Sequence, residues 1–314
     1  MELVDIKDKL NLLPIPEEGY RIFNIADKSY VGKNKKGNVI FVIESDNEKK
    51  KAFIQNTKEL TYFFNNKFLF NIDGNYVAKT VHMLVYNVNN NVNIDIFLRL
   101  TKAFALNTYD DSQEYLTGLF VSLKKLFSSA NKVGEFELQG LYAELYTILY
   151  FNQYGCDIVE YWQSKSKMKF DFSINDKKRI EVKSTTKANR IHKFRHEQLL
   201  SDIYDIKIVS IMLQKNDQGQ SLNELLEKVY AVYQDRVDVI THISQVVNNL
   251  SYDELSEIKY DLSYTENNIA IFNASDIPHF NEENPEGVSH TEYDSDLTRA
   301  NRISINDTIN WIKN

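Results

Sequence analysis

The stretch FDFSINDKKRIEVKSTTK, residues 170–187, decides the fold because it predicts two short strands joined by a turn. Apolar residues alternate with polar ones in both arms, as in a half-buried strand, and an Asn-Asp pair supplies the turn. Glu181 and Lys183 then share one face of the second strand, about 7 Å apart. Asp171 on the first strand is expected to join them across the hairpin.

A long amphipathic helix is predicted upstream of the hairpin, over residues 134–155. Glu144 lies on or beside its apolar stripe, three residues after Leu141 and four before Ile148. A carboxylate in that position is costly unless it is paired or bound to a cation. The alternative is a Glu144 at the edge of the stripe that forms a surface salt bridge.

The segments around the hairpin predict a mixed α and β core. Residues 156–162, CDIVEYW, are expected as a strand, residues 194–204 as a second helix and residues 207–214 as a closing strand. The order is then α-β-β-β-α-β, with a basic loop between the hairpin and the second helix. The expected fold class is α/β or α+β.

Three parts are expected along the chain. Residues 1–125 form a β-rich module, because short β-branched and aromatic segments there alternate with turn residues. Residues 126–215 form the core described above. Residues 216–314 form a helical and β segment, with a helix over 221–250 and a hairpin over 258–274 that turns at residues 266–268.

Composition indicates an ordinary globular chain of 314 residues, with 43% hydrophobic and 26% charged residues. The single cysteine, Cys156, excludes an internal disulfide and a multi-cysteine zinc site. The first residues are acidic, without a basic and apolar leader, and no apolar run is long enough for a bilayer. We therefore expect a cytoplasmic protein that does not associate with membranes.

Charge is unevenly distributed. The net charge of −7 gives the whole chain no general attraction to nucleic acid, but residues 163–196 hold eleven Lys or Arg against three acids. Such a run is often only a solvated face. The alternative is a phosphate-binding loop that positions a nucleic acid without reading its sequence, and its candidate residues are Lys187, Arg190, Lys193 and Arg195.

Three carboxylates, Glu144, Asp171 and Glu181, are expected to converge on one patch. Two like charges 4 Å apart repel by about 4 kcal/mol at an effective dielectric constant of 20. A hard divalent cation with oxygen ligands relieves that repulsion, Mg²⁺ first and Mn²⁺ as the second choice.

This arrangement resembles the PD-(D/E)XK nuclease superfamily, in which an acid on the first helix precedes an Asp and an ExK motif on a hairpin. Within it, the chain is similar to a bacterial family of unknown function found in restriction and phage-defence gene clusters. The motif-bearing resemblance covers residues 134–213, and Phe170 stands where the superfamily has Pro. It implies a restriction-endonuclease-like fold in which Asp171 and Glu181 bind Mg²⁺ and Glu144 completes the site.

The resemblance also implies that Lys183 positions or activates the attacking water. Gln198, at the start of the second helix, supports the site or the substrate backbone, or is simply a solvated helix residue. The function expected is a Mg²⁺-dependent DNA endonuclease that acts with other proteins of a bacterial restriction or phage-defence system. Two alternatives stay open: an inactive DNA-binding or scaffold subunit, and an RNA-cleaving nuclease.

Overall fold

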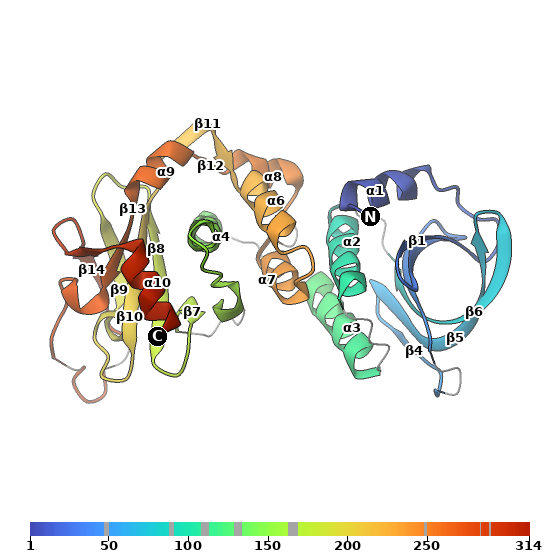
Figure 1. The fold of residues 1–314 in the computed structure, drawn as a ribbon, viewed down its shortest axis with the longest axis horizontal. Coiled ribbons are helices and arrows are strands. Elements are labelled where there is room, and N and C mark those ends of the chain that lie inside the picture. Colours follow the sequence, from blue (N-terminus) through green and yellow to red (C-terminus); the bar gives the residue numbers. More distant parts are fainter. Residues whose placement is uncertain are drawn as a thin grey trace. The chain divides into compact units, whose positions relative to one another are not determined.

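The computed structural model describes residues 1–314 except 47–49, 88–90, 108–112, 129–133, 163–168, 248–249, 283 and 289 (Figure 1). The chain divides into two compact units, one of residues 1–132 and 232–250 and the other of residues 133–231 and 251–314. Residues 216–314, expected as one C-terminal segment, are thus shared between the units. Helices and mixed sheets together make an α+β protein, which confirms the expected class.

The first unit is built on one six-stranded sheet. Its strands are β1 (Tyr20–Ala26), β2 (Ser29–Asn34), β3 (Val39–Glu44), β4 (Phe53–Asn56), β5 (Leu60–Ile72) and β6 (Asn75–Tyr86). Their order is β1-β2-β3-β6-β5-β4, and β1 also pairs in parallel with β5, so the sheet closes on itself (Figure 1). The inner face buries Ile22, Val42 and Phe70.

Among its described residues the first unit also has helices α1 (Leu3–Leu12), α2 (Asn91–Leu106), α3 (Gln113–Ser128) and α7 (Val237–Val247). Both α2 and α3 pack against α7, which comes more than 100 residues later in the chain. The buried side of α7 is an apolar stripe that includes Val239, Ile240 and Ile243. None of the described helices is long and apolar enough to cross a bilayer.

The second unit has a five-stranded mixed sheet of order β15-β13-β10-β8-β7. These strands are β7 (Phe172–Ser173), β8 (Lys178–Thr185), β10 (Asp205–Met212), β13 (Ile269–Asn273) and β15 (Arg302–Ile303). Strands β8 and β10 are parallel, and the other neighbours are antiparallel. Helix α4 (Glu135–Gln153) packs against β8.

Two small sheets and several short helices surround this sheet. Strand β9 (Ile191–Arg195) pairs with β14 (Glu292–Asp296), and β11 (Lys215–Ser221) pairs with β12 (Lys259–Tyr260). The α-helices are α5 (His196–Leu199), α6 (Leu222–Val232), α8 (Tyr252–Glu257), α9 (Leu262–Asn268) and α10 (Ile305–Lys313). The 3₁₀ helices are η1 (Val159–Tyr161) and η2 (Ala274–Asp276).

The strand expected over residues 156–162 is wrong. The side chain of Asp157 accepts the backbone N–H of Val159, which starts the 3₁₀ helix η1, and only an isolated bridge from Trp162 to Phe172 joins the sheet. The third strand of the expected order is instead β9, inside the segment expected as a basic loop. The order of elements after α4 is therefore η1, three strands, α5 and β10.

Two expected elements are shorter or of another kind. The helix expected over residues 194–204 is the single turn α5, because the hydroxyl of Ser201 accepts the N–H of Tyr204 and turns the chain towards β10. The hairpin turn expected at residues 266–268 is the end of helix α9. Asp261 caps that helix by accepting the N–H of Tyr264.

The close approach of β1 and β2 gives a testable prediction. A Cβ added at Gly32 would overlap the carbonyl oxygen of Arg21 on β1, and backbone cannot move aside as a flexible side chain can. We expect Gly32→Ala to lower the free energy of unfolding by about 3 kcal/mol, measured by urea denaturation. Gly118→Ala is the control, since open space lies around that α3 position and a gain of about 0.5–1 kcal/mol is expected.

Candidate active site

Helix α4 is positioned by its own ends. Glu135 and Glu137 lie in its first turn, where carboxylates stabilise the positive end of the helix dipole. Gly155, with φ of +71°, ends the helix, and the N–H of Cys156 bonds back to the carbonyl of Phe151. The helix so fixed carries Glu144 towards the central sheet.

The hairpin predicted for residues 170–187 is formed by β7 and β8, although β7 is only two residues long and Asp171 lies directly before it. Asn175 closes the turn, because its side-chain oxygen accepts the N–H groups of Lys177 and Lys178 at 2.9 Å each. The register pairs Phe172 with Ile180, and both are fully buried. Phe170, in the place of the superfamily Pro, is also buried in the core.

Glu181 is the centre of the site and is buried at 4% exposure. Its Oε1 accepts hydrogen bonds from the Lys183 ammonium at 2.7 Å and from Gln198 Nε2 at 2.6 Å. Its Oε2 is buried too and has no hydrogen-bond partner among the described residues. A buried carboxylate oxygen without a donor is costly, so Oε2 is a place where a cation would bind favourably.

Asp171 and Glu144 are held beside Glu181 by one donor each. The backbone N–H of Val182 donates to Asp171 Oδ2 at 2.7 Å, which fixes the carboxylate against β8 between Glu181 and Lys183. The indole Nε1 of Trp162 donates to Glu144 Oε2 at 2.7 Å. The structure thus brings together the residues that the sequence singled out on α4 and on the hairpin.

The three carboxyl groups are all disfavoured as anions. Burial, the largest cause, raises the pKa of Glu144 to about 7. Burial and then the charges of Glu181 and Glu144 raise the pKa of Asp171 well above its ordinary value. Burial also raises the pKa of Glu181, although Lys183 opposes it. The patch therefore lacks the positive charge that would stabilise three ionised carboxylates.

A divalent cation fits the chemistry of this donor set, although not as a preformed cage. Among the described residues no three Asp, Glu, His or Cys side chains form a ready metal-binding group. The fit rests on hard oxygen donors and on the orphaned Oε2 of Glu181, both suited to Mg²⁺ or Mn²⁺. Asp171 and Glu181 could hold such an ion, together with Glu144, whose charge acts on Asp171.

Gln198 and Trp162 both support the site, but the sequence singled out only Gln198. Gln198, for which the sequence left two interpretations open, is buried and links Glu181 to the backbone N–H of Arg195, which its Oε1 accepts at 3.0 Å. The solvated-helix interpretation of Gln198 is therefore wrong. Trp162 was missed, because no local pattern pairs an indole with an acid 18 residues earlier.

The candidate phosphate-binding residues separate into two groups. Lys187, Lys193 and Arg195 are exposed on or beside β9, as expected. Glu292 on β14 lies near two of them, 4.0 Å from Lys193 and 3.5 Å from Arg195, and partly offsets their charge. Other basic residues of the run, Lys165 and Lys167, lie outside the described residues.

Arg190 is a correction, because it is buried at 3% exposure and does not face solvent. Its guanidinium donates to the carbonyl and hydroxyl oxygens of Ser210 at 2.8 Å each and to the carbonyl of Asn268 at 2.7 Å. Burial lowers the pKa of the neighbouring His192 to about 3, so its ring is neutral at pH 7. Arg190 therefore ties the start of β9 to β10 and α9 and does not contact phosphate.

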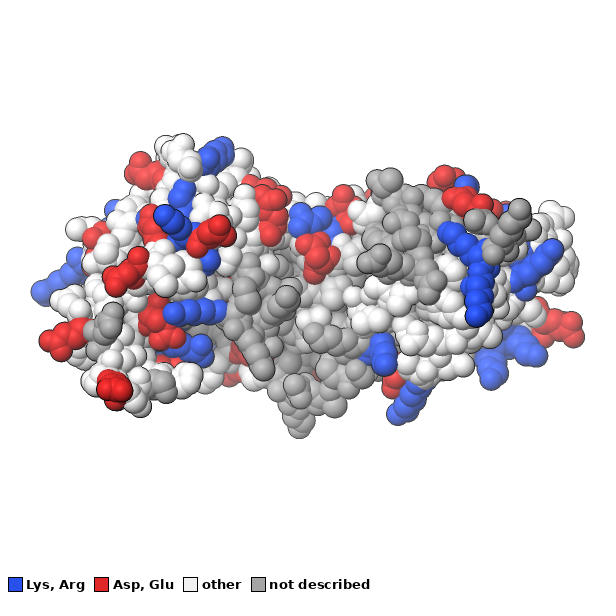
Figure 2. Space-filling model, turned by 90° about the horizontal axis from the view of Figure 1, so that it is seen from below, with Lys and Arg blue, Asp and Glu red and all other residues white. Residues whose placement is uncertain are grey.

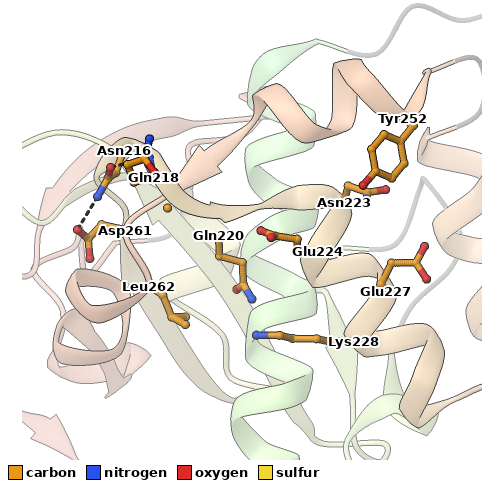
Figure 3. Close-up of a pocket in the computed structure, with 11 residues that line it drawn as sticks. Asn216, Gln218, Gln220, Asn223, Glu224, Glu227, Lys228, Tyr252, Asp261 and Leu262 are labelled. Carbon is orange, nitrogen blue, oxygen red and sulfur yellow. Dashed lines mark hydrogen bonds between the residues drawn. The ribbon is translucent and has the colours of Figure 1, made fainter.

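A separate cavity of about 670 Å³ lies between β11, α6, α8 and α9 (Figure 3). Two of its carboxylates serve as helix caps: Glu224 accepts the N–H of Ser221, and Asp261 accepts that of Tyr264. Asp261 also accepts a bond from the amide of Asn216 (Figure 3). None of the residues that surround Glu181 lines this cavity, so we do not place the chemistry there.

Comparison with known proteins gives one match. A family model described as "Putative PD-(D/E)XK family member" matches residues 18–298, which extends well beyond the motif-bearing region and includes most of both units. It confirms the resemblance found in the sequence. No curated protein and no solved structure matches the chain.

The buried position of Arg190 predicts that replacing it lowers the stability of the protein. We expect Arg190→Met to lower the free energy of unfolding by about 3 kcal/mol, because three buried oxygen acceptors lose charged donors. Thermal or urea unfolding measures the change. Lys187→Met, at an exposed position near β9, is the control and should leave stability unchanged. An Arg190 variant as stable as the wild type would contradict the assignment.

Proposed function

Because the chain belongs to the family described as "Putative PD-(D/E)XK family member", we propose that it is a nuclease that hydrolyses phosphodiester bonds of DNA with Mg²⁺. The observation that carries the proposal is the single patch formed by Asp171, Glu181 and Lys183. An isolated D and ExK motif arises easily by chance, but here Asp171, directly before β7, bonds to β8, which carries Glu181 and Lys183, beside an acid from α4.

Asp171 and Glu181 are the proposed ligands of the ion. Each is fixed through one oxygen, Asp171 by the N–H of Val182 and Glu181 by Lys183 and Gln198. The second oxygen of each then remains for the cation. When bound, Mg²⁺ would polarise the scissile phosphate and lower the pKa of the attacking water. Proteins usually bind Mg²⁺ through one or two carboxylates, and Asp171 and Glu181 supply two.

Lys183 is proposed to act on the nucleophile. One of its three N–H donors is used by Glu181, and its side chain is 21% exposed, so the ammonium reaches both the buried carboxylate and solvent. It can orient a water or stabilise charge that develops on the phosphate. The adjacent ion pair keeps the ammonium at the patch.

Gln198, Trp162 and Glu144 are positioning residues in this proposal. Gln198 holds Oε1 of Glu181, so that rotation of the carboxylate away from the patch would break two hydrogen bonds. Trp162 donates to Glu144 Oε2 and so holds the carboxylate of Glu144 in place. A fixed carboxylate needs no reorganisation when the ion and the phosphate bind, which is how preorganised sites lower barriers.

Substrate and biological context extend the proposal further. The exposed Lys187, Lys193 and Arg195 supply phosphate contacts near the patch, which position a polynucleotide without reading its sequence. DNA as substrate, a role in bacterial restriction or phage defence, and other proteins of such a system as partners follow from the family resemblance. Duplex DNA and RNA are compared in the same assay to separate the DNA-cleaving and RNA-cleaving functions.

Cleavage tests the proposal directly. Incubation with plasmid DNA and Mg²⁺ should give cut products, and Lys183→Ala should lower the rate at least about a hundredfold, since it removes the group that acts on the nucleophile. Lys177→Ala, at an exposed position in the turn of the same hairpin, should keep wild-type activity. Calorimetry should still detect Mg²⁺ binding to the Lys183 variant. Cleavage that survives in this variant would remove Lys183 from the mechanism.

Thermal unfolding tests the proposed metal ligands without any substrate. In a chelator, Asp171→Asn should raise the midpoint of thermal unfolding by about 3 °C, because it removes one of three crowded carboxylates and keeps an acceptor for Val182. Mg²⁺ should raise the midpoint of the wild type and not that of the variant. Equal shifts with Mg²⁺ in both proteins would place the ion elsewhere.

A further inference from the structure

The closed sheet of the first unit opens at one end into a cavity of about 380 Å³, which we call the mouth pocket. It is formed where β1 begins, β2 ends, β5 begins and β6 ends. Lining residues that matter here are Tyr20, Lys35, Lys36, Asn38, Phe63 and Asn87. Open ends of closed sheets are common places for small polar and aromatic ligands.

Two aromatic rings of the pocket are held rigidly. Tyr20 and Phe63 are each half-buried, and each packs edge to face on Phe68, with ring centroids 5.2 Å apart in both pairs. Edge-to-face contact fixes the ring planes. The exposed parts of Tyr20 and Phe63 then form an apolar aromatic wall that needs no rearrangement before a flat ligand packs on it.

The turn that carries the two lysines is also preformed. Asn34 Oδ1 accepts the N–H groups of Lys36 at 2.9 Å and Asn38 at 3.0 Å. Gly37, with φ of +78°, lets the turn close. Lys35 and Lys36 are exposed, and neither forms an ion pair within the part of the chain that the structure describes. Their ammonium groups therefore remain for an anionic ligand.

The charge at the pocket is positive. No carboxylate is among its described lining residues. The acids nearest to it in sequence are Glu17 and Glu18, which are exposed, and the half-buried Glu59, whose backbone carbonyl accepts the N–H of the lining residue Asn87. The first unit, residues 1–132 and 232–250, holds 19 Lys and Arg against 17 Asp and Glu, although the whole chain carries −7. On the face drawn in Figure 2, Lys and Arg lie on both units and are interspersed with Asp and Glu.

We propose that the mouth pocket binds one unpaired nucleotide of a single-stranded nucleic acid. The base packs against Tyr20 and Phe63, and Lys35 and Lys36 contact the flanking phosphates. Aromatic packing together with basic residues is the chemistry by which proteins hold single strands without strict sequence preference. DNA and RNA share this chemistry. The inference goes beyond the proposed function, because the unit concerned contains none of the proposed catalytic residues.

The test measures binding by the full chain. Fluorescence anisotropy with labelled 12-nucleotide single-stranded DNA and RNA, in a chelator, should show that Lys35→Glu with Lys36→Glu weakens binding at least tenfold. The slope of log affinity against log salt should fall by about 1.4, since each phosphate contact on a single strand releases about 0.7 counterion. Tyr20→Leu with Phe63→Leu should weaken binding about tenfold without changing that slope.

Lys67→Glu with Lys124→Glu is the matched control, because it makes the same charge change at exposed positions of the same unit. Little change in the control supports the pocket, and an equal loss overturns it. Equal affinity for a duplex, or wild-type affinity in both pocket variants, also overturns the inference. Plasmid cleavage is measured separately, so unaltered cleavage beside lost single-strand binding leaves both proposals standing, whereas absent cleavage counts only against the proposed function.

Discussion

The second unit depends on one buried acid. Glu181 lies in the middle of the parallel strand pair β8–β10, where an ionised carboxylate without partners would cost several kcal/mol. Lys183 and Gln198 satisfy one of its oxygens, which requires β8 and α5 to come together in one arrangement. The other oxygen has no hydrogen-bond partner in the described part of the chain. A buried carboxylate oxygen without a donor is the kind of group that a bound cation would stabilise, which is why the proposed function centres on Glu181.

The predictable parts of this site were those encoded by short-range spacing. Alternation of apolar residues fixed the faces of residues 170–187, and the helical period placed Glu144 near the sheet. Burial of Arg190 was not predictable, because its acceptors, Ser210 and Asn268, are 20 and 78 residues away. A basic residue in a basic run appears solvated until the tertiary partners are known.

The misplaced elements have a similar cause. Residues 156–162 have strand-like composition, but the side chain of Asp157 accepts the backbone N–H of Val159, and residues 159–161 form a 3₁₀ helix instead. The helix expected over residues 194–204 ended early for the same kind of reason, at Ser201. The helix or strand propensity of a whole segment does not reveal a single side-chain contact to the backbone. Each of these two contacts changes the direction of the chain close to the site.

Helix α7 has a consequence for how the protein is made. The first unit needs α7 to cover the apolar faces of α2 and α3, yet α7 leaves the ribosome only after the β7–β8 hairpin has been synthesised. The N-terminal module therefore cannot complete its core as a nascent chain of 132 residues. Its folding waits for a segment embedded in the sequence of its neighbour, which favours nearly simultaneous maturation of the two units rather than one after the other.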